Sequence, residues 1–203
     1  MYHGQFEIDK YLHQNFFENV YDGFFVECGA VDGLTESSCL FFEQKLNWTG
    51  INIEPVPSSY NLLIQNRPNS INLNYALSDK NEEATFTQAN HPQHSIFGNG
   101  SLNHTAEHKY DLINQGCSFH KLNVTCKRFA DIFTYEREID LFVLDVEGSE
   151  LKALDGILDL DVSLQPKVFC IEYPFAGLKE IEKKLVNYNL FSLQLQNAIF
   201  VKK

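Results

Sequence analysis

The chain has 203 residues, 44% of them hydrophobic, and a formal net charge of −11. This length suits one domain with a full core, and the acidic balance argues against nucleic acid as the main partner. No run approaches the roughly 18 apolar residues of a membrane span, and the opening residues show no secretion signal. Five cysteines without a C-x-x-C pair favour free thiols in a reducing compartment, so we expect a cytoplasmic protein.

The first part of the chain alternates between helical and extended patterns. Residues 1–22 are polar and aromatic and predict a short helix or arm that packs across the domain. The apolar run at 24–28 predicts a strand buried on both faces. The patterns that follow predict, in order, a helix at 36–47, a strand at 51–53, a helix capped by Ser58 with Tyr60, Leu63 and Ile64 on one face, and a strand at 71–77.

Residues 78–120 have a different composition, rich in Asn, His and Gly, and they hold five of the seven histidines. A short edge strand is predicted at 83–87. The rest of the stretch is too long for an ordinary connection inside a compact domain. We therefore expect a variable insert that is either functional or mobile, and we interpret it as a lid over a bound ligand.

The C-terminal part repeats the alternation and ends in a hairpin. The pattern predicts, in order, an extended segment at 122–126, a helix at 128–133, a strand at 141–144, a helix opened by Gly148, a strand at 168–171, a helix from Leu178, and strands at 190–195 and 198–201 joined by a turn at Gln196 and Asn197. This order predicts an α/β fold: a doubly wound, mostly parallel Rossmann-like sheet with helices on both faces and a C-terminal antiparallel hairpin.

Acidic residues stand at the ends of the predicted buried strands, namely Glu27, Glu54, Asp145 and Glu172. Ligands of such sheets lie outside the carboxyl ends of the strands, where the strand order reverses. The first strand also runs into a turn that contains Gly29 and Gly33, which lets backbone N–H groups approach a ligand closely. The acids and glycines together predict a cofactor site at this edge of the sheet.

The spacing of the glycines distinguishes two cofactors. A nicotinamide dinucleotide needs G-x-G-x-x-G to receive its pyrophosphate, whereas this chain has Gly29-x-x-x-Gly33, with Val31 where a central glycine is often found. S-Adenosyl-L-methionine carries no phosphate, and its ammonium group and ribose diol suit nearby acids. We therefore expect S-adenosyl-L-methionine, with a nicotinamide oxidoreductase as the weaker alternative.

Four motifs, in this order along the chain, resemble a known family. They are V-E-C-G-A-V-D-G at 26–33, W-T-G-I-N-I-E-P at 48–55, A-L-S at 76–78 and L-D-V-E-G-S-E at 144–150. Together they resemble the FkbM family of S-adenosylmethionine-dependent methyltransferases, from Phe24 to Glu172. Two departures are visible: Glu27 stands where the family usually has Asp, and Val31 where it often has Asn. The carboxylate and both glycines are kept.

The resemblance implies a class I methyltransferase that acts on hydroxyl oxygens. Family substrates are sugars of glycans and glycolipids, or polyketide and related natural products, and such domains also occur fused to glycosyltransferases. We expect residues 1–203 to form a single methyltransferase domain that O-methylates a sugar hydroxyl, either alone or as one module of a larger glycan-modifying protein. O-methylation of a non-sugar natural product and a non-catalytic scaffold module are the alternatives.

The cofactor-binding residues that we expect are Glu27, Gly29, Ala30, Asp32, Gly33, Glu54, Ala76, Leu77 and Asp145. The glycine turn lies against the methionine end of the cofactor, and Glu54 takes the ribose diol. Asp32 either reaches the ammonium group or only caps a helix. Residues 76–78 line the adenine or simply end a core strand.

The catalytic residues that we expect are Asp145, Glu147 and His94. A sugar hydroxyl needs a base, or at least a carboxylate that accepts its proton. Asp145 could instead hold the ammonium group, and Glu147 could be first-turn helix charge. His91 or His94 is a candidate base on the lid.

The remaining histidines of the insert suggest a metal site. His104 and His108 are four residues apart and could face one side of a helix as metal ligands. A solvated polar loop is the simpler interpretation, so we expect no metal.

Overall fold

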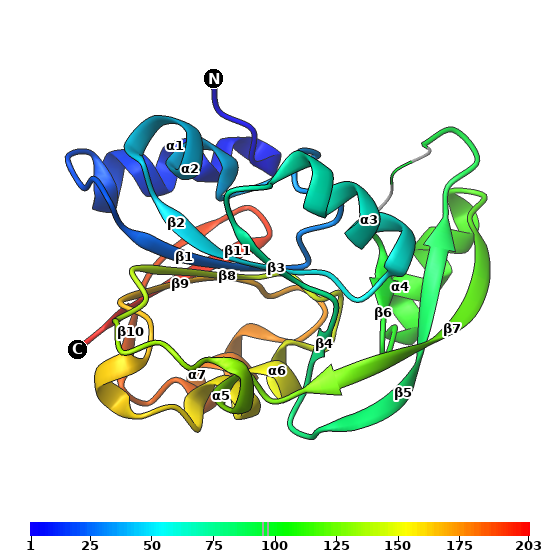
Figure 1. Ribbon diagram of the computed structural model, residues 1–203. Coiled ribbons are helices and arrows are strands. Elements are labelled where there is room, and N and C mark those ends of the chain that lie inside the picture. Colours follow the sequence, from blue (N-terminus) through cyan, green and yellow to red (C-terminus); the bar gives the residue numbers. More distant parts are fainter. Residues whose placement is uncertain (95, 97) are drawn as a thin grey trace.

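The computed structural model describes residues 1–94, 96 and 98–203. Its centre is a seven-stranded sheet with the strand order β10-β11-β9-β8-β1-β2-β3 (Figure 1). The strands are β1 Phe24–Cys28, β2 Thr49–Ile53, β3 Ile71–Leu73, β8 Leu141–Leu144, β9 Val168–Glu172, β10 Tyr188–Gln194 and β11 Asn197–Lys202. All neighbours pair in parallel except β11, which is antiparallel to β9 and β10. The predicted fold class is confirmed.

Helices cover both faces of this sheet (Figure 1). One face carries η1 Gln5–Glu7, α1 Ile8–Leu12, η2 His13–Phe17, α2 Leu40–Leu46 and α3 Pro57–Asn66. The other face carries α5 Phe129–Ile132, α6 Glu150–Leu158 and α7 Leu178–Lys184, and a short turn, η3 Val162–Leu164, follows α6. The two layers explain why the central strands β1, β8 and β9 are buried along their whole length.

Successive residues of a strand pack on opposite faces of the sheet. Phe25 belongs to the core cluster that also contains Trp48 and the N-terminal helices, whereas Val26 and Phe142 belong to the cluster under α5, α6 and α7. Every residue of β1 is buried, as expected for a parallel strand covered on both sides. Leu12 of α1 is fully buried in the first cluster, so the predicted packing of residues 1–22 across the domain is confirmed.

The helix predicted at 36–47 starts later than expected. Glu36 has a φ of 53°, which is outside the right-handed helical region. The backbone N–H groups of Ser38 and Cys39 donate to the carboxylate of Glu27. The segment before α2 is therefore a loop, and Glu27 of β1 holds this loop at the edge of the site.

Two details of α3 also differ from the prediction. The helix begins at Pro57 and is preceded by Val56, so Ser58 is not its cap. Proline is well suited to the first helical position because the missing N–H would have no partner there. Ile64 is 41% exposed and faces away from the core, whereas Leu63 is fully buried.

The stretch from 76 to 127 builds a second sheet. The strand predicted at 71–77 divides into β3 and β4 Ala76–Leu77, and β4 leaves the main sheet. The second sheet has the order β4-β7-β5-β6, with β5 Glu82–Asn90, β6 Gly100–Ser101 and β7 Ser118–Lys127, and α4 Ala106–Asn114 lies between β6 and β7 in sequence. The strand predicted at 83–87 is confirmed as part of β5, but β5 is longer and lies between β7 and β6, so it is not an edge strand. The described part of the expected insert contains β5, β6, α4 and the first residues of β7, and residues 95 and 97 lie outside the described residues.

The C-terminal hairpin is confirmed, with a turn one residue earlier than predicted. Leu195, with a φ of 52°, takes part in the turn, and Asn197 already belongs to β11. No helix in the described part of the chain is long and apolar enough to cross a membrane. All five cysteines are free thiols.

Candidate active site

The site lies where the strand order of the main sheet reverses. β1 pairs with β2 on one side and with β8 on the other, so the loops after β1 and β8 meet at one edge. Gly29 has a φ of +88°, and a Cβ atom there would lie 2.0 Å from the carbonyl oxygen of Asp145. Only glycine allows this close approach. The first predicted glycine therefore sets the distance between the two loops.

Glu54 ties the glycine loop to the end of β2. Its Oε2 accepts a hydrogen bond from the N–H of Val31 at 2.9 Å, and its Oε1 accepts one from the N–H of Val56 at 2.8 Å. The side chain is 5% exposed, and this burial raises the pKa of Glu54 to about 7 although both hydrogen bonds oppose the shift. Val31 itself has a φ of 49°, which is unusual for a β-branched residue.

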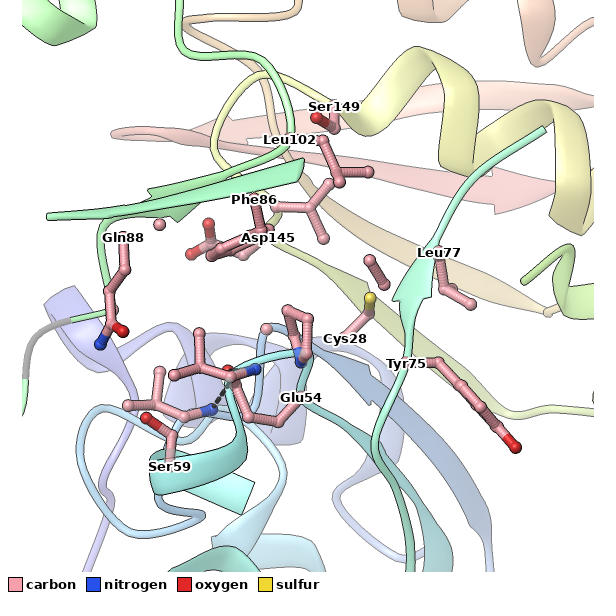
Figure 2. Close-up of a pocket in the computed structure, with 18 residues that line it drawn as sticks. Cys28, Glu54, Ser59, Tyr75, Leu77, Phe86, Gln88, Leu102, Asp145 and Ser149 are labelled. Carbon is pink, nitrogen blue, oxygen red and sulfur yellow. Dashed lines mark hydrogen bonds between the residues drawn. The ribbon is translucent and has the colours of Figure 1, made fainter. Parts of the chain in front are cut away.

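An apolar cavity lies directly above Glu54. Its apolar wall consists of Val56, Tyr75, Ala76, Leu77, Phe86 and Leu102. Figure 2 shows Phe86 and Leu102 across the cavity from Glu54, with Gln88 at one side. Ala76 and Leu77 belong to β4, and Phe86 and Gln88 to β5, so the second sheet closes this cavity. A flat aromatic group fits such a wall, with Glu54 and Gln88 as polar contacts.

A second, polar cavity adjoins the apolar one. The two cavities share Cys28, Gly29, Val31, Gly98 and Asp145 as lining residues. Of the expected residues, the polar cavity is also lined by Glu27, Ala30, His94, Glu147 and Glu172. An elongated ligand can therefore extend from the apolar cavity past Gly29 and Asp145 into the polar one.

Three carboxylates meet in the polar cavity. One ligand oxygen from each of Asp145, Glu147 and Glu172 lies within 4.8 Å of the others. Burial raises the pKa of all three carboxyl groups, and their mutual repulsion raises the pKa of Glu147 and Glu172 further. Asp145, Glu147 and Glu172 were all predicted at strand ends or just beyond them, and the sheet brings them together.

The carboxylate of Glu27 is committed to the loop before α2. It accepts hydrogen bonds from Ser37 Oγ at 2.7 Å, Ser38 N at 2.6 Å and Cys39 N at 3.2 Å. Arg67 Nη1 lies 3.6 Å from Glu27 Oε2. Burial raises the pKa of Glu27, and Arg67 and these hydrogen bonds oppose that shift. The carboxylate of Glu27 therefore holds the wall of the cavity in place, and its hydrogen bonds are made to the protein. Arg67 was not identified from the sequence, because no local pattern marks it.

Two expected cofactor contacts have other roles in the structure. Asp32 Oδ1 accepts hydrogen bonds from the N–H groups of Leu34 and Thr35 at 3.1 and 2.8 Å. These bonds hold a turn of the loop and cap no helix, because the next helix, α2, begins only at Leu40. A Cβ atom at Gly33 would lie 2.6 Å from side-chain atoms of Arg67 and Leu63. Neither Asp32 nor Gly33 lines either cavity, because both serve the packing of the loop.

The histidines of the insert divide into two pairs. The rings of His91 and His94 lie 4.5 Å apart, and of this pair only His94 lines the polar cavity. His104 precedes α4, so His104 and His108 do not share a helical face as predicted, although their rings lie 4.9 Å apart. His108 is 3% exposed, and its Nε2 lies 3.4 Å from Glu147 Oε2. Burial lowers the pKa of His108 to about 4, so this contact involves a neutral imidazole.

The fold and the two joined cavities define a Rossmann-like, S-adenosylmethionine-dependent methyltransferase. An apolar pocket with a strand-end acid at its base matches an adenosine, and the adjoining glycine loop carries no phosphate-binding G-x-G-x-x-G. The chain belongs to the FkbM methyltransferase family, because the family profile described as "Methyltransferase FkbM domain" matches residues 27–192. The resemblance seen in the motifs is confirmed.

Other comparisons give two further findings. Among solved structures, the chain is similar to a TehB-like SAM-dependent methyltransferase from Corynebacterium glutamicum ATCC 13032 Kitasato, with 12% sequence identity and a TM-score of 0.48 over 97% of this chain and 88% of that chain. No match is found among curated proteins.

Proposed function

We propose that this methyltransferase acts on a hydroxyl group of a sugar in a glycan. The observation that carries the proposal is the chemistry of the polar cavity beside Asp145. Besides its carboxylates, the cavity is lined by the amide side chains Asn99, Gln115, Gln196 and Asn197. Amides and carboxylates can pair with the many hydroxyls of a sugar, whereas an apolar acceptor needs apolar walls.

The residues of the apolar cavity would hold the adenosine part of the cofactor. Phe86 and Leu102 face one side of an adenine, and the free lone pairs of Glu54 accept hydrogen bonds from the ribose diol. Gly29 and Ala30 border the methionine part where the cavities join.

Asp145, Glu147 and His94 line the place where the acceptor hydroxyl would lie. When bound, the cofactor supplies a methyl group: a C–O bond forms to the acceptor, the methyl–sulfur bond breaks with its electron pair left on sulfur, and the hydroxyl proton passes to a nearby base. Burial raises the pKa of Asp145 to about 6, which suits its carboxylate to accept a proton near neutral pH, and burial also raises the pKa of Glu147. His94 is the second candidate for this role.

The domain organisation belongs to the same proposal. Residues 1–203 act as one methyltransferase domain, in which the insert at 78–120 supplies the walls that close the cofactor cavity. The expected context is a glycan-modifying system, with glycosyltransferases as partners in the same chain or nearby. The free cysteines suit a reducing compartment such as the cytoplasm.

The test is a transfer assay with a cofactor that carries a deuterated methyl group. The purified chain is incubated with two matched panels, one of mono- and oligosaccharides and one of phenolic and polyketide alcohols, and products are read by mass spectrometry. We expect a mass gain on saccharides only, and its loss in Glu147→Gln. Transfer to the second panel alone would refute the sugar assignment, and cofactor binding without transfer to either panel would favour the scaffold alternative.

A further inference from the structure

The three carboxylates of the polar cavity differ from the other buried acids of the site. Glu27 and Glu54 each accept hydrogen bonds from at least two N–H or O–H donors. In the part of the chain that the structure describes, no N–H donor bonds to the side chains of Asp145 or Glu172.

One oxygen of Glu172 also stands out, because it has no hydrogen-bond partner among the described residues. The residue is 8% exposed, and its Oε2 is buried without a hydrogen bond from any described residue. Leaving a buried carboxylate oxygen unpaired costs the full desolvation of that group. The oxygen belongs to a side chain whose ligand atom lies within 4.8 Å of those of Asp145 and Glu147. A ligand that accepts electron pairs from all three would remove the cost.

The basic groups of the chain do not supply that ligand. Among the described residues, the ion pairs of Lys and Arg side chains involve other acids, and the contact of His108 with Glu147 brings an imidazole to the cluster. His108 lies between Glu147, whose Oε2 is 3.4 Å from His108 Nε2, and the ring of Phe175, whose centroid is 4.0 Å from that of the imidazole. A neutral imidazole is itself a ligand for divalent metal ions, and its Nε2 faces Glu147.

We propose that Asp145, Glu147 and Glu172 bind one divalent metal ion of the Mg²⁺ or Mn²⁺ type, with the His108 imidazole beside it. Carboxylate oxygens are the ligands that these hard cations prefer, and histidine is compatible with Mn²⁺. The proposal departs from the expectation that no metal binds, and it replaces the His104 and His108 pair by a site centred on acids.

The position of the site suggests what the ion does. Asp145 and Glu147 follow β8, and Glu172 is the last residue of β9. Asp145 also borders the cofactor cavity, so a bound ion would stand between cofactor and acceptor. It could take an acceptor hydroxyl oxygen as a further ligand and fix its orientation. This role rests on the proposed function, whereas metal binding itself does not.

Metal binding can be measured without any acceptor. The chain is treated with EDTA, dialysed and titrated with MnCl₂, and free Mn²⁺ is read by electron paramagnetic resonance, with and without saturating S-adenosylhomocysteine. We expect one saturable site in both conditions. Glu172→Gln and Glu147→Gln should each weaken it about tenfold or more, because each removes a charged ligand. The matched control is Glu182→Gln, an exposed acid on α7, which should leave Mn²⁺ binding unchanged.

Three results would overturn the proposal: no saturable site in the wild-type chain, equal Mn²⁺ affinity in wild type and in both cluster variants, or loss of the site when S-adenosylhomocysteine binds. The last result would assign the acids to the cofactor ammonium group. Thermal unfolding of each variant shows that the fold is intact. Binding of S-adenosylhomocysteine is also measured by calorimetry in the presence of EDTA. Binding there without a metal site would refute only the metal proposal, and the methyltransferase assignment would stand.

Discussion

Arg67 is the buried cation on which the glycine loop depends, and its removal gives the strongest stability prediction. The side chain is fully buried. Its Nε and Nη2 lie 2.7 and 2.6 Å from Glu43 Oε2, and its Nη1 lies 3.6 Å from Glu27 Oε2. Nη1 also donates to the Gly33 carbonyl at 3.0 Å and to Ser37 Oγ at 3.1 Å. One guanidinium therefore joins α2, α3 and the loop after β1.

Arg67→Met should destabilise the fold by about 3–5 kcal/mol, because breaking a buried ion pair leaves an uncompensated charge behind. For a domain of this size each kcal/mol lowers the melting temperature by about 2–4 °C, so the expected fall is roughly 10 °C. Urea unfolding followed by circular dichroism measures the difference. The double variant Arg67→Met, Glu43→Gln should recover part of the loss, since it removes one of the charges left unpaired.

The matched control is Arg128→Met. Arg128 pairs with Asp159 on the surface, and its side chain is 34% exposed, so we expect a loss below about 1 kcal/mol. If Arg67→Met cost no more than this control, or if the added Glu43→Gln change gave no recovery, the assignment of Arg67 as the buried partner of these acids would be wrong.

Three further changes test the site. Val31→Asn should raise the free energy of unfolding by about 1 kcal/mol, because asparagine tolerates the positive φ of 49° better than valine does; a lower urea midpoint would contradict this. Affinity for S-adenosylhomocysteine should rise as pH rises through about 7, since ribose hydroxyls favour the ionised form of Glu54. Calorimetry at several pH values should show a weaker pH dependence of this affinity in Glu54→Gln than in the wild type. An equal pH dependence in both would count against the ribose contact. His94→Gln should lower turnover about 100-fold with cofactor affinity unchanged if His94 is the base; unaltered turnover would leave the carboxylates as the proton acceptors.

The strand-end acids were predictable because their signals are local. A short apolar run followed by an acid identifies Glu54 or Asp145 without knowledge of any other part of the chain, and the sheet then places each acid at the same edge. The same local signal, an apolar run that ends in an acid, predicts Glu172 at that edge. It did not show that Asp145, Glu147 and Glu172 converge within 4.8 Å, because that depends on loop conformations such as the φ of 56° at Glu147.

The second sheet was missed because its pairing is not local. β5 pairs with β7 from Glu82 opposite Cys126 to Asn90 opposite Ser118, and most side chains of both strands are at least partly exposed. Such strands lack the continuous apolar run that marks β1 or β8. Arg67 was missed for a related reason: its partners Glu27 and Glu43 are distant in sequence, and a single arginine at a helix end carries no pattern.

The most direct test of the whole account is isothermal titration of the purified chain with S-adenosylhomocysteine, with NAD as the control ligand and Glu54→Gln as the control variant. The account predicts binding of S-adenosylhomocysteine with one molecule per chain, no binding of NAD, and a clear loss of affinity in Glu54→Gln. Binding of NAD instead, or equal affinity of the adenosyl ligand in wild type and Glu54→Gln, would contradict the placement of an S-adenosylmethionine cofactor across the two cavities.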